Sequence, residues 1–123
     1  MGNRPLEHCR ILVVEDEFLL AEELSYGLDD AGAVVLGPVS TIERALALLR
    51  EQAPPDGAIL DVNLGGVFVY PLADTLTERR IPFVFTTGYD PGGLPERFAH
   101  VATCEKPFNL PGITAVVARA IHP

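Results

Sequence analysis

The stretch Ile11-Leu12-Val13-Val14-Glu15-Asp16 decides the fold, because four consecutive apolar residues end abruptly in two carboxylates. A short apolar run of this kind is typical of a strand buried on both faces, as in a parallel sheet covered by helices. Acidic side chains directly after such a strand lie at its carboxyl end, where open α/β sheets bind their ligands. The stretch therefore predicts a central strand and part of a site.

Three further apolar runs also end in polar residues. Asp61 follows residues 57–60, Thr86-Thr87 follow residues 83–85, and Glu105-Lys106 follow residues 101–104. Parallel strands present their carboxyl ends at one edge of a sheet, so we expect these groups to converge. Each alone has an ordinary explanation as an acidic helix start, a turn residue or a β-forming threonine. Their coincidence at four strand ends favours a shared site.

The segments between these runs have the period of amphipathic helices. Helices are expected near residues 17–31, 42–49, 71–76, 94–100 and 113–120, and one more strand at 33–36. This alternation predicts an α/β fold, a flavodoxin-like (βα)5 three-layer sandwich with parallel strand order 2-1-3-4-5. In that order the first and third strands are adjacent, which brings Glu15 and Asp16 beside Asp61.

Two local signals refine this prediction. Ser40, with Glu43 three residues later, is expected to cap the second helix. Gly65-Gly66 predicts a pliable loop after the third strand. The segment from 88 to 100 is rich in Gly and Pro, so the fourth helix is expected to be short.

Length and charge limit the class of protein. The 123 residues suit one domain, which we place at 1–123 with no output domain. A formal charge of −8 argues against direct binding of nucleic acid. No apolar stretch approaches the roughly 20 residues of a membrane span, which favours a cytoplasmic protein. Cys9 and Cys104 lack metal-site spacing and are expected to be buried thiols in a reducing compartment.

The chemistry of the expected site is that of a divalent cation and a phosphoryl group. Clustered carboxylates remain ionised when a cation joins them, and hard oxygen ligands suit Mg²⁺. We expect Asp16 and Asp61 to bind Mg²⁺ directly, and Glu15 directly or through water. The backbone carbonyl of Asn63 is a reasonable further ligand.

Asp61 is then positioned to accept the phosphoryl group. A carboxylate that attacks phosphorus forms an acyl phosphate, provided that the charge on the phosphoryl oxygens is offset. Mg²⁺ supplies part of that offset and the Lys106 ammonium another part. The Thr87 hydroxyl can donate to a phosphoryl oxygen.

Four motifs together carry a resemblance to a known family. They are VVEDE at 13–17, LDVNL at 60–64, FTTGY at 85–89 and EKPF at 105–108. Over nearly its whole length the chain resembles a bacterial response-regulator receiver domain. The resemblance implies a phosphoacceptor, not an enzyme, that receives its phosphoryl group from a sensor histidine kinase or a histidine phosphotransfer protein. It also implies signalling to a downstream protein target, by a monomer or weak homodimer.

The stretch from Pro82 to Tyr89 resembles the FATGUY subgroup of receivers, with Thr86 where that motif has Ala. Most receivers carry Tyr or Phe three residues before the strand-5 lysine, and here that position is Thr103. Our hypothesis is that Thr87 still moves toward the phosphoryl group, and that Tyr89, Phe98 or Phe108 repacks in place of the missing aromatic. Tyr89 is also expected to slow hydrolysis of the aspartyl phosphate.

Two other classes of protein remain open at this stage. One is a receiver-like interaction module that binds a partner without phosphorylation. The other is a small aspartyl-nucleophile phosphatase, which would require a second acidic residue two positions after Asp61 for general acid catalysis. Asn63 occupies that position.

Overall fold

The framework of the protein is one five-stranded sheet, seen in a computed structural model that describes residues 4–88 and 93–123. The strands are β1 (Arg10–Val14), β2 (Val34–Val39), β3 (Gly57–Asp61), β6 (Phe83–Thr87) and β7 (Thr103–Glu105). All neighbouring strands are parallel, in the order β2-β1-β3-β6-β7. Since β4 and β5 form a separate hairpin, the predicted order 2-1-3-4-5 is confirmed.

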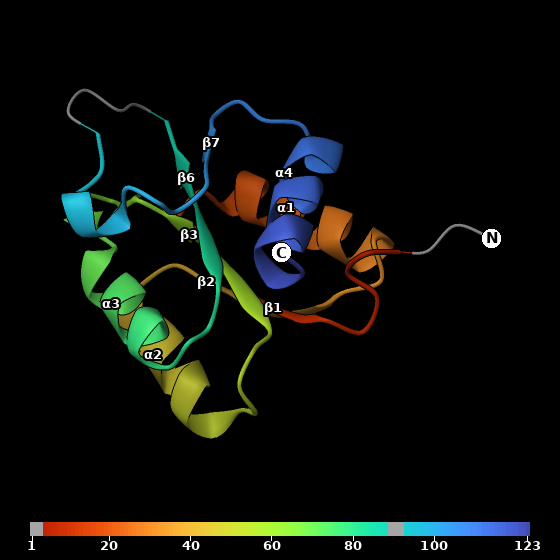
Figure 1. Ribbon diagram of the computed structural model, residues 1–123, viewed down its shortest axis with the longest axis horizontal. Coiled ribbons are helices and arrows are strands. Elements are labelled where there is room, and N and C mark those ends of the chain that lie inside the picture. The colour runs from red at the N-terminus through yellow and green to blue at the C-terminus, as the bar shows by residue number, and fades with distance from the viewer. Residues whose placement is uncertain (1–3, 89–92) are drawn as a thin grey trace.

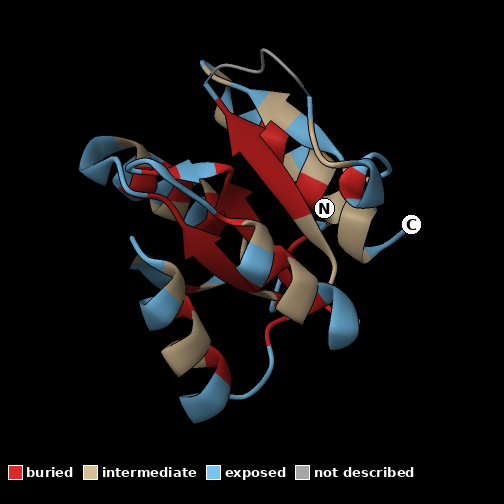
Figure 2. Ribbon diagram, turned by 90° about the vertical axis from the view of Figure 1, so that its left-hand side faces the viewer, coloured by how far each residue is buried: buried red, intermediate tan, exposed pale blue. Residues whose placement is uncertain are grey.

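Helices cover both faces of this sheet (Figure 1). On one face lie α1 (Phe18–Asp30) and α4 (Leu110–Ile121), and on the other α2 (Ile42–Glu51) and α3 (Tyr70–Glu78). Each face has its own apolar core, and β1 and β3 lie buried between the two cores (Figure 2). The three-layer sandwich is therefore confirmed. No helix within the described residues has the length and apolar composition needed to cross a bilayer.

The fourth crossover departs from the prediction of a helix at 94–100. Only a single 3₁₀ turn, η1 (Glu96–Phe98), forms there, with Pro95 as its N-cap. Pro95 starts the turn only a few residues before β7, which leaves no length for a full α-helix. The turn is held by Arg97, whose guanidinium pairs with Asp74 of α3 at 2.9 Å, and by Phe98, which is buried.

The loop after β3 is more ordered than predicted. β4 (Asn63–Leu64) and β5 (Val67–Phe68) pair antiparallel across Gly65-Gly66, whose φ angles are +62° and +99°. Positive φ at both central residues is the signature of a type I′ turn, which glycine adopts without strain. The pair of glycines between Leu64 and Val67 was therefore a hairpin signal.

Two smaller predictions were wrong. Thr41, not Ser40, caps α2, and its hydroxyl accepts a hydrogen bond from the Arg44 amide at 3.1 Å. β2 extends to Val39, which shifts the helix start and its cap by one residue. Cys9 is buried as expected, but Cys104, on the edge strand β7, is only half-buried.

The end of α3 carries a strained residue. Arg80 has φ of +59° and follows the C-cap residue Arg79, while the amide of Ile81 bonds back to the carbonyl of Leu76 at 2.9 Å. This hydrogen bond belongs to the Schellman motif, in which glycine normally occupies the left-handed position. An arginine there is destabilising, because in the left-handed conformation its Cβ lies too close to the backbone carbonyl oxygen.

We expect Arg80→Gly to raise the free energy of unfolding by about 1 kcal/mol, because glycine removes that cost. Urea denaturation followed by circular dichroism measures the change. The matched control is Arg79→Gly, at a φ of −88°, where glycine brings only extra freedom to the unfolded chain and should destabilise. Equal effects of the two substitutions would contradict the argument.

Candidate functional site

The polar residues predicted from the strand ends meet at one edge of the sheet. Asp16 follows β1, Asp61 ends β3, Thr87 ends β6, and Lys106 follows β7. All four line one hollow of about 460 Å³, together with Asn63. Glu15 is buried, and one of its carboxylate oxygens lies 3.2 Å from Lys106. The convergence expected from parallel strands is therefore present.

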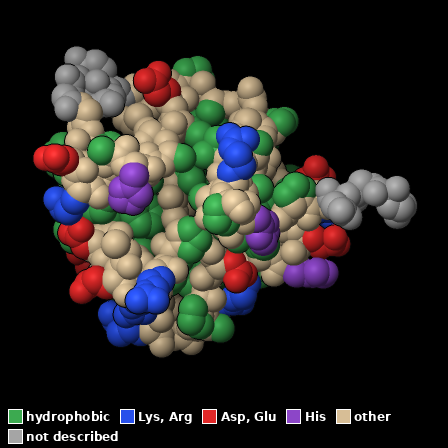
Figure 3. Space-filling view, in the orientation of Figure 1, with side chains coloured by type: hydrophobic (Ala, Val, Ile, Leu, Met, Phe, Trp, Pro, Cys, Tyr) green, Lys and Arg blue, Asp and Glu red, His purple; other side chains and the backbone are tan. Residues whose placement is uncertain are grey.

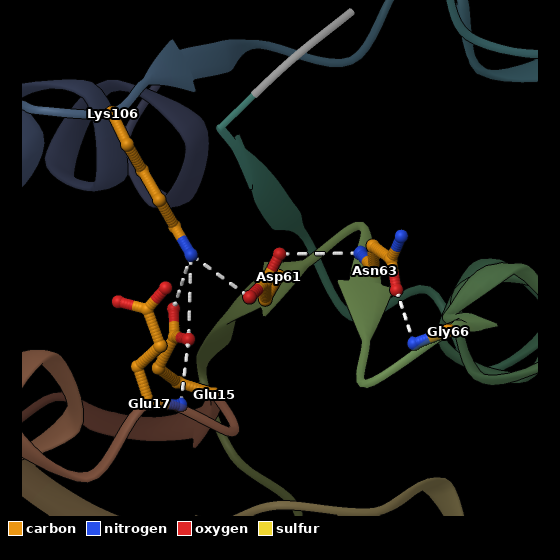
Figure 4. A network of polar contacts seen from close by, with 6 residues as sticks. All are labelled: Glu15, Glu17, Asp61, Asn63, Gly66 and Lys106. Carbon is orange, nitrogen blue, oxygen red and sulfur yellow. Dashed lines mark hydrogen bonds and ion pairs between the residues drawn. The ribbon is translucent and has the colours of Figure 1, made fainter.

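Lys106 forms the centre of this site (Figure 4). Its Nζ lies 2.9 Å from Asp61 Oδ2 and 3.2 Å from Glu15 Oε1. The Lys106 side chain is 15% exposed, whereas those of Asp61 and Glu15 are 5% and 1% exposed. The ammonium group thus joins two buried carboxylates from adjacent strands.

Lys106 is a single ammonium group beside two buried carboxyl groups. Burial raises the pKa of Glu15 to about 7, and its hydrogen bond with Asp61 adds to the rise. Burial alone would lower the pKa of Lys106, but the hydrogen bond and charge of Asp61, with those of Glu15, raise it overall. The site therefore favours additional positive charge.

The carboxylates lie close enough to share a metal ion. One oxygen from each of Glu15, Asp16 and Asp61 lies within 4.8 Å of the others. Glu15 Oε1 is buried and, although paired with Lys106, accepts no well-aligned hydrogen bond. Three oxygen donors with such an unsatisfied atom fit a hard divalent cation.

The β4-β5 hairpin positions the Asp61 side of the hollow. The Asn63 amide donates to Asp61 Oδ1 at 3.2 Å, and the Asn63 side-chain oxygen accepts from the Gly66 amide at 2.6 Å. Asp61 thus has both oxygens engaged, one by the backbone and one by Lys106. Sequence reasoning placed Asn63 in the site but missed the hairpin that orients it.

A cluster of aromatic rings extends from the site along one face of the sheet. Phe68 of the hairpin stacks on Tyr70 at 5.5 Å between centroids, and Tyr70 stacks on Phe98 at 5.6 Å. Phe98 also meets Phe85 edge-on at 5.6 Å, and Phe85 and Thr87 share a face of β6 because strand side chains alternate.

Of the two described aromatic residues proposed to replace the missing switch, Phe98 contacts Phe85 on β6, the strand that carries Thr87. Phe108 packs into the core on the other face. Tyr89 lies outside the described residues, so its predicted role stays a prediction.

The sequence did not predict that the hydroxyl of Thr86 is buried without a hydrogen-bond partner among the described residues. Thr86 pairs with Asp61 in the register of β3 and β6, and its Oγ1 is buried without a hydrogen-bond partner in the part of the chain that the structure describes. An unsatisfied buried hydroxyl costs on the order of 1–3 kcal/mol, so this position is a local weakness beside the site.

The structure is a parallel α/β sandwich with an acidic cluster and a lysine at its switch point, and known proteins share this fold. SdrG from Sphingomonas melonis Fr1 is 38% identical, superposes with a TM-score of 0.80, and the match covers all of both chains. A response regulator receiver protein from Sinorhizobium medicae is 26% identical, with a TM-score of 0.79 over 95% of this chain and 97% of that one.

The chain belongs to the response-regulator receiver family. Among curated proteins, the phyllosphere-induced regulator PhyR of Methylorubrum extorquens is 29% identical over 119 residues. That match covers 90% of this chain but 43% of PhyR, so the chain spans less than half the length of that relative. No protein-family profile matches the chain.

The contacts of Lys106 predict that replacing its ammonium group lowers the stability of the fold. In metal-free buffer, Lys106→Met should lower the free energy of unfolding by about 2 kcal/mol, because two buried carboxylates lose their partner. Urea denaturation in the presence of a chelator measures the change. In an Asp61→Asn background the same substitution should cost clearly less.

The control is Arg50→Met, which removes an exposed cation on α2 and should change stability by under about 0.5 kcal/mol. A Lys106→Met cost as small as the control's would show that the ammonium contributes nothing to the fold.

Proposed function

We propose that the protein is a receiver that accepts a phosphoryl group on Asp61 in a Mg²⁺-dependent two-component phosphorelay. The observation that carries this proposal is the Lys106 ammonium held between Asp61 and Glu15, with Asp16 completing the acidic cluster. Mg²⁺ would be held by Glu15, Asp16, Asp61 and the backbone carbonyl of Asn63. When bound, it would offset negative charge on the phosphoryl oxygens.

In the proposed reaction one carboxylate oxygen of Asp61 attacks phosphorus. The new O–P bond forms as the P–N bond of the donor's phosphohistidine breaks, and the bonding electrons return to the imidazole nitrogen. Lys106, already 2.9 Å from Asp61, remains beside the developing charge. The hydroxyl of Thr87, which lines the same hollow, donates to a phosphoryl oxygen.

The neighbours of Asp61 favour an acceptor over a phosphatase. A phosphatase would use a second acid to protonate the leaving group, and Asn63 offers no such proton. Its side-chain oxygen is instead engaged by the Gly66 amide in the hairpin turn. The aspartyl phosphate thus forms beside groups that stabilise it. It loses its phosphoryl group to water only slowly.

The proposed partners follow from the phosphorelay. A sensor histidine kinase or a histidine phosphotransfer protein donates the phosphoryl group, and a downstream protein reads the modified state by direct contact. We propose that residues 1–123 act as one receiver domain in the cytoplasm, as a monomer or weak homodimer and without direct contact to nucleic acid. Membership of the FATGUY subgroup is part of the same proposal.

We further propose how the modification is transmitted. Movement of Thr87 toward the phosphoryl group shifts β6, and with it Phe85, whose ring contacts Phe98 and Tyr70. Aromatic pairs prefer edge-on and offset arrangements, so a shift of one ring forces its neighbours to repack. Phe98 thereby takes the part that an aromatic residue at position 103 would play.

Phosphorylation is tested by incubation with acetyl phosphate and Mg²⁺ followed by mass spectrometry. The wild-type protein should gain the mass of one phosphoryl group, and Asp61→Asn should gain none. Asp30→Asn, an exposed change at the end of α1, is the matched control and should react like wild type. A folded wild-type protein that gains no mass would contradict the proposal and favour an interaction module.

The metal part is tested separately by Asp16→Asn. Losing a ligand should raise the Mg²⁺ concentration needed for half-maximal phosphorylation by about tenfold or more. Unchanged Mg²⁺ dependence would exclude Asp16 as a ligand, while leaving Asp61 as the acceptor.

Transmission is tested by NMR with beryllofluoride and Mg²⁺ as a mimic of the phosphoryl group. Ring resonances of Phe98 and Tyr70 should shift on addition, and Thr87→Ala should reduce those shifts while shifts at Asp61 persist. Phe108, in the other core, serves as the internal control and should change little. Unmoved Phe98 and Tyr70 resonances would refute the transmission path.

A further inference from the structure

The phosphoryl hollow has one wall to which the proposed reaction assigns no role. That wall is the β4-β5 hairpin, whose residues Gly65 and Phe68 line the hollow together with Asn63. A Cβ atom added at Gly65 would lie 3.6 Å from Asp16 Oδ2, so the turn of the hairpin reaches across to the acidic cluster. The hairpin therefore borders the space that a phosphodonor facing Asp61 would occupy.

Phe68 places an accessible aromatic ring in this wall. The residue is 56% exposed although it lines the hollow. It pairs with Asn63 in the antiparallel register, so the two side chains lie on the same face of the hairpin. The Asn63 amide in turn donates to Asp61 Oδ1 at 3.2 Å. Phe68 thus lies beside the residue that orients the proposed phosphoacceptor.

The Phe68 ring is supported from one side. Tyr70 stacks on it, with 5.5 Å between the ring centroids and an angle of 10° between the ring planes. Tyr70 is itself stacked on Phe98, which is buried. A ring that is already held in place loses little freedom when a second flat ring stacks on its exposed side. The wall therefore offers a prepared stacking surface.

The loop after β1 adds a negative charge to the same hollow. Glu17 lines the hollow, is exposed, and forms no ion pair within residues 4–88 and 93–123. Figure 4 shows its side chain pointing in the same direction as that of Glu15. Glu17 is not one of the three clustered carboxylates that could share a metal ion. Its charge therefore persists when Mg²⁺ and Lys106 offset the others.

The acidic lining is a property of the hollow and not of every surface. The lining contains one basic residue, Lys106, against three acidic residues, Asp16, Glu17 and Asp61. The face of the molecule in Figure 3, by contrast, carries Lys, Arg and His side chains among its hydrophobic residues. The electrostatic field of the hollow thus favours a positively charged leaving group over a negatively charged one.

We propose that Phe68 determines which phosphodonors the site accepts, by stacking on the imidazole ring of a phosphohistidine, and that the charge of Glu17 assists it. The inference rests on the proposed function of Asp61 as phosphoacceptor. With the phosphoryl group on one nitrogen and a proton on the other, the donor imidazole is a flat cation. Cations are attracted to the face of an aromatic ring.

The leaving group is what separates this donor from an acyl phosphate. As the Asp61 oxygen bonds to phosphorus, the electrons of the P–N bond return to the imidazolium ring, and neutral imidazole leaves. An acyl phosphate such as acetyl phosphate instead releases a carboxylate. The negative face of the Phe68 ring and the Glu17 charge both disfavour that anion.

The experiment compares two small phosphodonors, monophosphoimidazole and acetyl phosphate, at saturating Mg²⁺. Mass spectrometry gives the initial rate of Asp61 phosphorylation with each. Phe68→Ala should lower the rate with monophosphoimidazole by about threefold to fivefold and leave the rate with acetyl phosphate nearly unchanged. Phe68→Leu, which keeps apolar volume without the aromatic face, should behave like Phe68→Ala, whereas Phe68→Tyr should keep the wild-type ratio of rates.

Glu17→Gln should act in opposite directions on the two donors. The rate with monophosphoimidazole should fall and the rate with acetyl phosphate should rise, and both effects should shrink at high salt. The matched controls are Val67→Ala, exposed on the same hairpin but outside the lining, and Glu22→Gln, exposed on α1. Both controls should keep the wild-type ratio of rates.

Three results with Phe68→Ala would overturn the proposal. Equal loss of both rates would mark a purely structural residue, and unchanged rates would show that the ring plays no part. A change confined to the lifetime of the aspartyl phosphate would mark a shield against water. In each case Asp61 remains a phosphoacceptor, whereas a wild-type protein that neither donor phosphorylates would refute the phosphoacceptor proposal and this one together.

Discussion

The ion pair between Lys106 and the buried carboxylates of Asp61 and Glu15 is the constraint on which the rest of the site depends. Burying two like charges on adjacent strands is costly, and only a cation placed between them makes the arrangement tolerable. The parallel sheet supplies that geometry, since β1, β3 and β7 end at the same edge. The fold thus holds the site in a state that also favours a further cation, as the pKa of Glu15, raised to about 7, indicates.

The same constraint explains how two carboxyl groups can be buried side by side at one edge of a small domain. Asp61 is 4% exposed, yet it lines the hollow at the strand ends. Its carboxyl group is therefore accessible from the hollow while it pairs with the Lys106 ammonium. The hairpin that follows β3 helps to orient the Asp61 carboxyl group, because the Asn63 amide donates to one of its oxygens and Lys106 donates to the other. Hydrogen bonds from a tight turn and from the lysine that follows β7 fix the Asp61 carboxylate more firmly than either would alone.

The strand order and the converging groups could be predicted from the sequence because they depend on patterns of many residues. Apolar runs that end in polar residues mark strand ends, and only a few topologies connect five such units. The details that were wrong depend on one or two residues. Whether Ser40 or Thr41 caps α2 was decided by how far β2 continues past Gly37-Pro38, and the segment near Phe98 was decided by tertiary burial of one ring. The strand ends predicted that Lys106 lies near the carboxylates. They did not predict the unsatisfied hydroxyl of Thr86, since it reflects the packing around a single side chain.

The sheet also divides the interior into two cores that share no residue. Side chains of β6 alternate between them, with Phe83 and Phe85 on the α2-α3 side and Val84 on the α1-α4 side. Substitutions in one core therefore leave the packing of the other largely untouched. Over evolutionary time such a partition lets the helices on the two faces of the sheet change separately, while the edge that carries Asp61 and Lys106 stays the same.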